Sequence, residues 1–221
     1  MDFIFMLTRS DETVLDCLET WDSVQDVGLR HAGFKDVGVD VSTLAELNRR
    51  MHERGVITYL EVVSTSTEAC LQSARAAVDI GVDRLMGGQE VAATLRLLEE
   101  TTIQYLPFPG RPTRHPTILG GDAGLVERQC SEFADMGCSG VDLLAYRATD
   151  AEPLDLVRAA RRGTDGYLVV AGSVSTARQI DDLRKAGADA FTIGSAVFDG
   201  TFSPRKGTVV SQLRDVLDAI N

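Results

Sequence analysis

Residues 167–198, YLVVAGSVSTARQIDDLRKAGADAFTIGSAVF, contain one complete structural unit and the beginning of the next. The run YLVV consists of residues that favour strands, and the segment TARQIDDLRKAG places apolar residues at three- and four-residue steps. These patterns predict a strand, an amphipathic helix that ends at Gly187, and a second strand from Ala188. A strand followed by a helix and another strand is typical of an α/β fold.

The same unit occurs eight times along the chain. Strands are predicted at 2–7, 31–38, 56–63, 82–88, 102–108, 140–146, 167–173 and 188–197. Helices are predicted at 12–24, 42–55, 67–81, 89–100, 125–137, 153–163, 176–187 and 209–220. Several helices end in a glycine, which accepts a left-handed C-cap at the lowest cost, namely Gly55, Gly81, Gly137 and Gly187.

Eight such units in 221 residues favour a closed (β/α)8 barrel, the TIM barrel, over an open doubly wound sheet, which alternates strands and helices in the same way. The apolar residues are spread evenly and no linker interrupts them, so residues 1–221 are predicted to form a single domain. Active sites in this barrel lie at the carboxyl ends of the strands. Candidate site residues are therefore sought at those ends.

Composition narrows the class of partner. The formal net charge of −11 repels phosphate backbones and anionic lipids, which argues against nucleic acid or a membrane surface and favours a small molecule. The N-terminal apolar run is too short for a signal peptide, and no later run reaches membrane-spanning length. Four cysteines lack metal-binding spacing and are interpreted as reduced core thiols of a cytoplasmic protein: Cys17, Cys70, Cys130 and Cys138. Homodimer formation is left open.

Two adjacent predicted strands end in a glycine followed by a serine, at Gly172–Ser173 and at Gly194–Ser195. Glycine lets backbone N–H groups approach an anion closely, and a following helix adds the positive end of its dipole. The last two strands are the usual phosphate position in such barrels. We therefore predict that these four residues bind a phosphate. The alternative is that the glycines only permit tight turns.

The segment AGSVSTARQIDDLRKAGADAFTIGSAVF (171–198) resembles the C-terminal third of the ribulose-phosphate-binding barrel superfamily. That superfamily includes phosphoribosyl isomerases, ribulose-phosphate and N-acetylmannosamine-6-phosphate epimerases, thiamin-phosphate synthase and orotidine-phosphate decarboxylase. The resemblance implies a phosphorylated substrate but no particular reaction, because the members differ in chemistry. Flavin-binding barrels use a similar cradle for the phosphate of FMN, so an FMN-binding oxidoreductase is an alternative.

The segment FKDVG ends the second predicted strand, and side chains alternate between the two faces of a strand. With Phe34 facing the helices, Lys35 points into the barrel. The same alternation in the third strand turns Tyr59 and Glu61 inward. A lysine and a glutamate on adjacent strands can shift each other's pKa, which suits Schiff-base formation or general acid/base catalysis. The alternative is a structural ion pair.

Four further residues are candidates on the remaining strand ends. In the sixth strand Asp142 is either a buried structural carboxylate or a catalytic one, because it lies near the strand start. Tyr146 and Arg147 lie nearer the rim, where a substrate hydroxyl or carboxylate can reach them. Arg9 follows the first strand and either binds substrate or pairs with Asp11 or Glu12.

The connection at 106–122, LPFPGRPTRHPTILGGD, is the longest in the chain and has no acid before Asp122. Its basic residues, of which Arg111 is a candidate for substrate binding, favour an anionic ligand, and long loops at this face often close over a site. The alternative is a proline-stiffened surface loop.

The superfamily's known reactions do not transfer to this chain as a whole. The Asp-x-Lys-x-x-Asp strand of the decarboxylase branch is absent, no predicted strand end carries the histidine of a metal-dependent epimerase, and the mannosamine-phosphate epimerases have their lysine on strand three. We therefore expect an enzyme without metal or other cofactor, an isomerase, an epimerase or an aldolase-type lyase, that acts on a small phosphorylated sugar or keto compound. A non-catalytic barrel that binds a phosphorylated metabolite is the remaining alternative.

Overall fold

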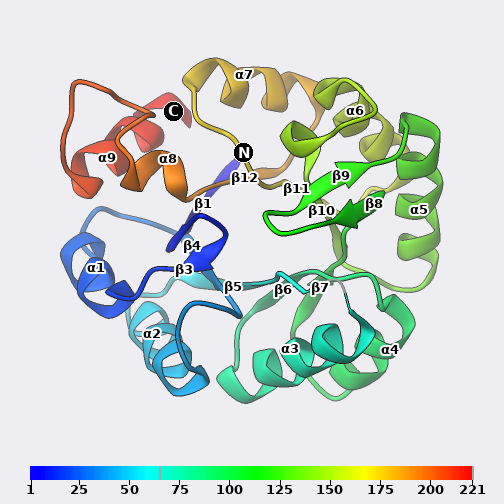
Figure 1. The fold of residues 1–221 in the computed structure, drawn as a ribbon, viewed down its shortest axis with the longest axis horizontal. Helices are drawn as coiled ribbons and strands as arrows, with labels where there is room; N and C mark the ends of the chain where they lie inside the picture. Colours follow the sequence, from blue (N-terminus) through cyan, green and yellow to red (C-terminus); the bar gives the residue numbers. More distant parts are fainter. Residues whose placement is uncertain (65, 221) are drawn as a thin grey trace.

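A computed structural model describes residues 1–64 and 66–220. Its centre is an eight-stranded sheet in which neighbouring strands pair in parallel, in the order β10-β11-β12-β1-β4-β5-β6-β7. The strands meet at the middle of the molecule and the helices form a ring around them (Figure 1). The chain is therefore a (β/α)8 barrel, as the sequence predicts.

The bounds of the elements agree closely with the repeated pattern. The sheet strands are β1 (Asp2–Met6), β4 (His31–Lys35), β5 (Ile57–Val62), β6 (Arg84–Gly87), β7 (Gln104–Leu106), β10 (Gly140–Leu143), β11 (Tyr167–Val170) and β12 (Ala190–Ile193). The helices are α1 (Cys17–Val24), α2 (Val41–Glu53), α3 (Thr67–Ile80), α4 (Val91–Leu98), α5 (Ala123–Asp135), α6 (Pro153–Gly163), α7 (Ala177–Ala186), α8 (Ser195–Phe198) and α9 (Val209–Ile220). The predicted helix-ending glycines, Gly55, Gly81, Gly137 and Gly187, all have positive φ, which confirms their assignment.

Two backbone hydrogen bonds join the outermost strands of the sheet and close the barrel. The N–H of Ser139 donates to the carbonyl oxygen of Tyr105, and the N–H of Asp142 donates to that of Pro107, each at 3.0 Å. Pro107 has no N–H of its own, so it takes part in this closure only as an acceptor. The closure fixes β10, and with it Asp142, against β7.

Short elements at the carboxyl ends of the strands depart from the simple repeat. The predicted first helix begins five residues late, because Glu12–Thr13 form β3, which pairs with β2 (Thr8–Arg9) in a hairpin. The long connection is not an open loop, since β8 (Arg111–Thr113) pairs with β9 (Ile118–Gly120). A 3-10 turn, η1 (Ala145–Arg147), replaces the end of the predicted sixth strand. These short local pairings therefore provide hydrogen-bond partners for backbone groups that lie beyond the ends of the barrel strands.

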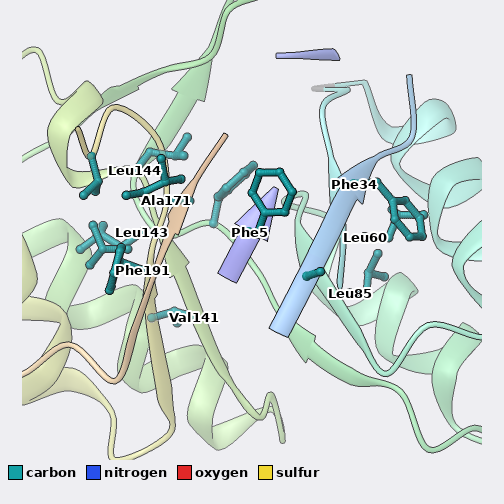
Figure 2. Packing of buried hydrophobic residues seen from close by; sticks show 14 of the residues in the cluster. Phe5, Phe34, Leu60, Leu85, Val141, Leu143, Leu144, Ala171 and Phe191 are labelled. Atoms are coloured by element: carbon teal, nitrogen blue, oxygen red, sulfur yellow. The ribbon is translucent and has the colours of Figure 1, made fainter. Parts of the chain in front are cut away.

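Side-chain alternation separates two apolar cores. The outer core lies between strands and helices, where Figure 2 shows Phe34, Leu60 and Leu85 grouped on one side and Leu143, Leu144, Ala171 and Phe191 on the other. A second cluster fills the barrel interior and consists of Ile4, Met6, Tyr59, Met86, Leu106, Val169 and Ala190. Phe34 and Tyr59 therefore face the directions that alternation predicts.

A polar layer fills the amino end of the barrel. The guanidinium of Arg84 lies 4.2 Å from the ring centre of Tyr167 and 5.3 Å from that of Tyr59, and its Nη1 donates to Tyr59 Oη at 2.6 Å. Tyr167 Oη donates to Asp2 Oδ2 at 2.7 Å. These stacked and hydrogen-bonded side chains occupy the interior at the strand starts. Within the described part of the chain, no helix has the length and apolar character needed to span a membrane.

Candidate active site

A cavity of about 320 Å³ opens at the carboxyl ends of the strands. Its walls come from β1, β4 and β5 on one side and from the loops after β11 and β12 on the other. The lining residues are Met6, Thr8, Asp11, Lys35, Glu61, Arg147, Gly172, Ser173, Val174, Ser175, Thr192, Ile193, Gly194, Ser195, Ala196, Asp199 and Thr201. The predicted lysine–glutamate pair and both glycine–serine turns therefore line one cavity.

Lys35 is the central cation of this cavity. Its side chain is nearly buried, and its Nζ donates to Glu61 Oε1 at 2.9 Å and to Asp11 Oδ1 at 3.1 Å. Lys35 and Glu61 are partners in the β4–β5 register, so the parallel pairing itself brings them together. Burial acts to lower the pKa of Lys35, but the charges of Glu61 and Asp11 outweigh burial and raise that pKa above its usual value. The two ion pairs therefore favour the ammonium form of Lys35.

Asp11 is a site residue that the sequence pattern did not reveal. It lies in the turn of the β2–β3 hairpin, where Ser10 and Asp11 have φ of 53° and 66°, a left-handed conformation that is costly for side chains other than glycine. Arg147 Nη1 donates to Asp11 Oδ2 at 2.5 Å and Nη2 donates to Oδ1 at 2.7 Å. The N–H of Thr117 also donates to Oδ2, at 3.2 Å. Asp11 thus joins Lys35 and Arg147 to the β8–β9 hairpin.

The same contacts shift the ionisation of Asp11. Burial acts to raise its pKa, but the hydrogen bonds from Arg147 and the charge of Lys35 prevail and hold the pKa well below its usual range. The polar pair Ser10–Asp11, three residues beyond the predicted first strand, was the available signal for this residue. The signal was weak because sequence spacing does not show that the turn folds inward.

Replacement of Asp11 by Asn is expected to lower the free energy of unfolding at neutral pH by about 1.5–3 kcal/mol, because charged hydrogen bonds to Lys35 and Arg147 are lost. Asn tolerates the left-handed backbone, so the charge is the main change. The folded-state pKa is depressed, so this stabilisation exists above the unfolded-state pKa and disappears as the pH falls toward the folded-state value. Urea titrations at neutral pH and at about pH 3 should show the difference between the two proteins shrinking. Asp181→Asn, at an exposed pair with Lys185, is the control.

The two glycine–serine turns lie across the cavity from Glu61. Gly172 and Ser173 have φ of 77° and 62°, which turns the chain sharply after β11. Among the described residues, no hydrogen-bond acceptor is present for the backbone N–H groups of Ser173 and Val174. A Cβ atom at Gly194 would lie 2.6 Å from the carbonyl oxygen of Thr8, so the second turn also packs too closely for any side chain. Backbone donors without a protein acceptor suit an anion.

Of the other predicted site residues, two lie at the cavity or beside it and the remaining three do not line it. Arg147 lines the cavity, and Tyr146 lies beside it in a second depression of about 400 Å³ that shares Asp11, Ser173 and Ser195 with the first. Asp142 is completely buried inside the barrel and does not line the cavity.

Two arginines lie outside the cavity. Arg9 does not pair with Asp11 or Glu12; its Nη2 lies 2.7 Å from Asp199 Oδ1, because Asp11 turns inward instead. Arg111 is exposed on the β8–β9 hairpin, and its charge acts on Asp150. The hairpin reaches the site through Thr117, whose carbonyl oxygen accepts a hydrogen bond from Arg147 Nη1 at 3.2 Å. A direct contact of Arg111 with a ligand in this cavity is therefore not supported by its position.

The described residues contain no group of three or more His, Cys, Asp or Glu side chains arranged to hold a metal ion. The residues that line the cavity are instead two cations (Lys35 and Arg147), three carboxylates (Asp11, Glu61 and Asp199) and several small residues. One wall of this cavity therefore offers backbone N–H donors for an anion, and the other wall carries the Lys35–Glu61 ion pair. These features, together with the fold, define a (β/α)8 barrel with a polar cavity at its carboxyl face.

Comparison with known proteins finds similar solved structures but no matching family. No family model matches the chain, and no curated protein matches it. Among solved structures, a tryptophan synthase complex from Pyrococcus furiosus has a TM-score of 0.66 at 15% identity over 97% of this chain and 95% of that chain. A structure described as native KDPGal has a TM-score of 0.65 at 10% identity over 100% and 96% of the two chains.

FabK from Thermotoga maritima is a third similar structure, with a TM-score of 0.60 at 13% identity over 87% of this chain. This chain spans only 58% of the FabK chain. At such low identities the three likenesses establish the shared barrel fold alone.

Proposed function

We propose that this protein is an enzyme of the ribulose-phosphate-binding barrel type that acts on a small phosphorylated sugar or keto compound. One observation carries the proposal: the Lys35–Glu61 ion pair and the turns at Gly172–Ser173 and Gly194–Ser195 line the same cavity. The N–H groups of Ser173 and Val174, which lack acceptors in the described chain, would donate hydrogen bonds to the phosphate oxygens. A volume of about 320 Å³ is at the lower end for ligand pockets, which favours a small metabolite.

The charge state of Lys35 favours acid/base chemistry over Schiff-base formation. As an ammonium ion, Lys35 stabilises negative charge on a carbonyl oxygen, while Glu61 takes the proton from the adjacent carbon. Return of that proton to the neighbouring carbon, together with transfer of the adjacent hydroxyl proton to the former carbonyl oxygen, completes an isomerisation. Delivery of a proton from water to the opposite face of the original carbon completes an epimerisation. Carbon–carbon cleavage, as in an aldolase-type lyase, produces the same stabilised oxyanion. A Schiff base would first require Lys35 to lose a proton, for which Glu61 at 2.9 Å is the nearest acceptor.

Glu61→Gln is expected to slow proton exchange by about 100-fold or more, because Gln cannot take a proton from carbon. The measurement is exchange of substrate hydrogens in deuterated water, followed by NMR, with a panel of three- to six-carbon aldose and ketose phosphates. Sulfate binding should persist in this variant, since the turns that hold the anion are unchanged. Glu127→Gln, at an exposed pair with Arg162, is the matched control. Equal exchange rates in Glu61→Gln and the parent protein would remove Glu61 from the mechanism.

A borohydride trap with the same panel, read by mass spectrometry, distinguishes the two uses of Lys35. The ammonium mechanism leaves Lys35 unmodified, whereas an adduct on Lys35 would show Schiff-base chemistry.

A non-catalytic metabolite-binding barrel is the second candidate, favoured by the mutual pairing of Lys35 and Arg147 with Glu61 and Asp11, which neutralises the charges without a ligand. Lys35→Ala and Glu61→Ala separate the two: a binder loses affinity at most, and an enzyme loses turnover. An FMN-binding oxidoreductase would purify as a yellow protein.

A further inference from the structure

Asp142 is a carboxyl group whose setting the proposed reaction does not explain. It lies on β10 with its side chain inside the barrel, and its exposed fraction is 0%. Neither carboxyl oxygen has a hydrogen-bond partner among the described residues. An aspartate on a strand normally reaches solvent, a cation or a backbone donor, and Asp142 contacts none of these at hydrogen-bonding distance.

The surroundings of Asp142 disfavour a negative charge. The inward residues of the strands near it are apolar, with Leu106 on β7 and Val169 on β11. The charged groups that act on it are Glu61 from β5, Lys35 from β4 and Arg147 from η1. Lys35 and Arg147 already neutralise Glu61 and Asp11, since two cations face two carboxylates. An ionised Asp142 would be a third carboxylate without a cation of its own.

Physical chemistry therefore favours the neutral acid. Transfer of a carboxylate into an apolar interior without hydrogen bonds is so costly that the group retains its proton instead. Burial raises the pKa of Asp142 well above its usual value, and the charge of Glu61 raises it further, against the opposing charges of Lys35 and Arg147. The backbone of Asp142 is fixed by the bond that closes the barrel, so the side chain cannot relax toward solvent by a shift of β10.

We propose that Asp142 is held as a neutral carboxylic acid inside the barrel. We further propose that its ionisation sets the alkaline limit of anion binding at the turns Gly172–Ser173 and Gly194–Ser195. With Asp142 neutral, the charges of Lys35, Arg147, Asp11 and Glu61 sum to zero and Asp199 is paired with Arg9, so an anionic ligand meets no net repulsion. With Asp142 ionised, the same group carries one net negative charge and repels the ligand. Asp142 does not line the cavity, so it is a positioning residue that acts through this charge balance. The inference rests on the proposed anion site.

The test uses sulfate as the probe, because sulfate does not change its charge between neutral and alkaline pH. Infrared difference spectra between the parent protein and Asp142→Asn should show the carbonyl band of a protonated carboxyl group at neutral pH. The sulfate affinity of the parent protein should fall by about threefold or more over the pH range in which that band disappears. Asp142→Asn should show no such fall. Asp142→Leu, a neutral apolar replacement with the same branching and a larger side chain, should behave like Asp142→Asn and serves if the first variant does not fold.

The outcomes separate the two proposals. A missing carboxyl band at neutral pH would overturn the inference even if sulfate binds. Equal loss of sulfate affinity at alkaline pH in the parent protein and in both variants would also overturn it, while leaving the anion site intact. Failure of sulfate to bind the parent protein at any pH would overturn the anion site, and the inference with it.

Discussion

Lys35→Met is expected to lower the free energy of unfolding at neutral pH by about 3–5 kcal/mol, because it leaves the buried carboxylate of Glu61 without its cation and removes one of the two cations that pair with Asp11. Lys35 is 4% exposed and donates to both Glu61 and Asp11. Met replaces the aliphatic part of the side chain, so the loss of charge is the principal change. Urea unfolding, followed by circular dichroism, measures the effect.

The pH dependence of this variant has a definite sign. Without Lys35, Asp11 loses one of the two cations that hold its folded-state pKa low, so that pKa rises and protonation stabilises the folded variant. The difference in the free energy of unfolding between the variant and the parent protein should therefore shrink as the pH falls and grow as the pH rises. Lys185→Met, at a 71% exposed lysine paired with Asp181, should cost less than about 0.5 kcal/mol. A Lys35→Met deficit as small as that of the control would show that the buried cluster contributes no stability.

Gly172→Ala is expected to reduce sulfate affinity by about tenfold or more, because the added methyl group alters the turn that presents the N–H groups of Ser173 and Val174. Gly172 has a φ of +77°, and a Cβ atom there would overlap the Nε atom of Arg147. Arg147 would have to move, which disturbs its bidentate contact with Asp11. Isothermal titration with sulfate or inorganic phosphate measures the affinity.

Gly81 supplies a matched control for this substitution. It has the same φ of +77°, ends α3, and has open space where a Cβ atom would lie. Gly81→Ala should cost about 1–2 kcal/mol of stability for the left-handed backbone and leave sulfate affinity unchanged. If both variants bind sulfate as the parent protein does, the turn at Gly172 is not part of an anion site.

The sequence alone determined the barrel and the face that carries the cavity. The alternation of strand and helix is local and appears eight times, and each unit buries its own apolar stripe against the next. Strand alternation also sufficed to orient Lys35 and Glu61, because inward and outward positions follow from a period of two. The glycines at 172 and 194 were recognisable because few other residues allow such close backbone approach.

The pairing of the polar groups follows from the folded molecule and not from the sequence pattern. Asp11 joins Lys35 and Arg147 across 24 and 136 residues of sequence, a contact that requires the hairpin turn to fold inward. Arg9 therefore pairs with Asp199, and Arg111 lies on the outer part of a hairpin instead of in the cavity. The complete burial of Asp142 depends on closure between β7 and β10. Periodicity encodes which face of an element is buried, whereas ion pairing depends on distances between elements, and these distances exist only in the closed barrel.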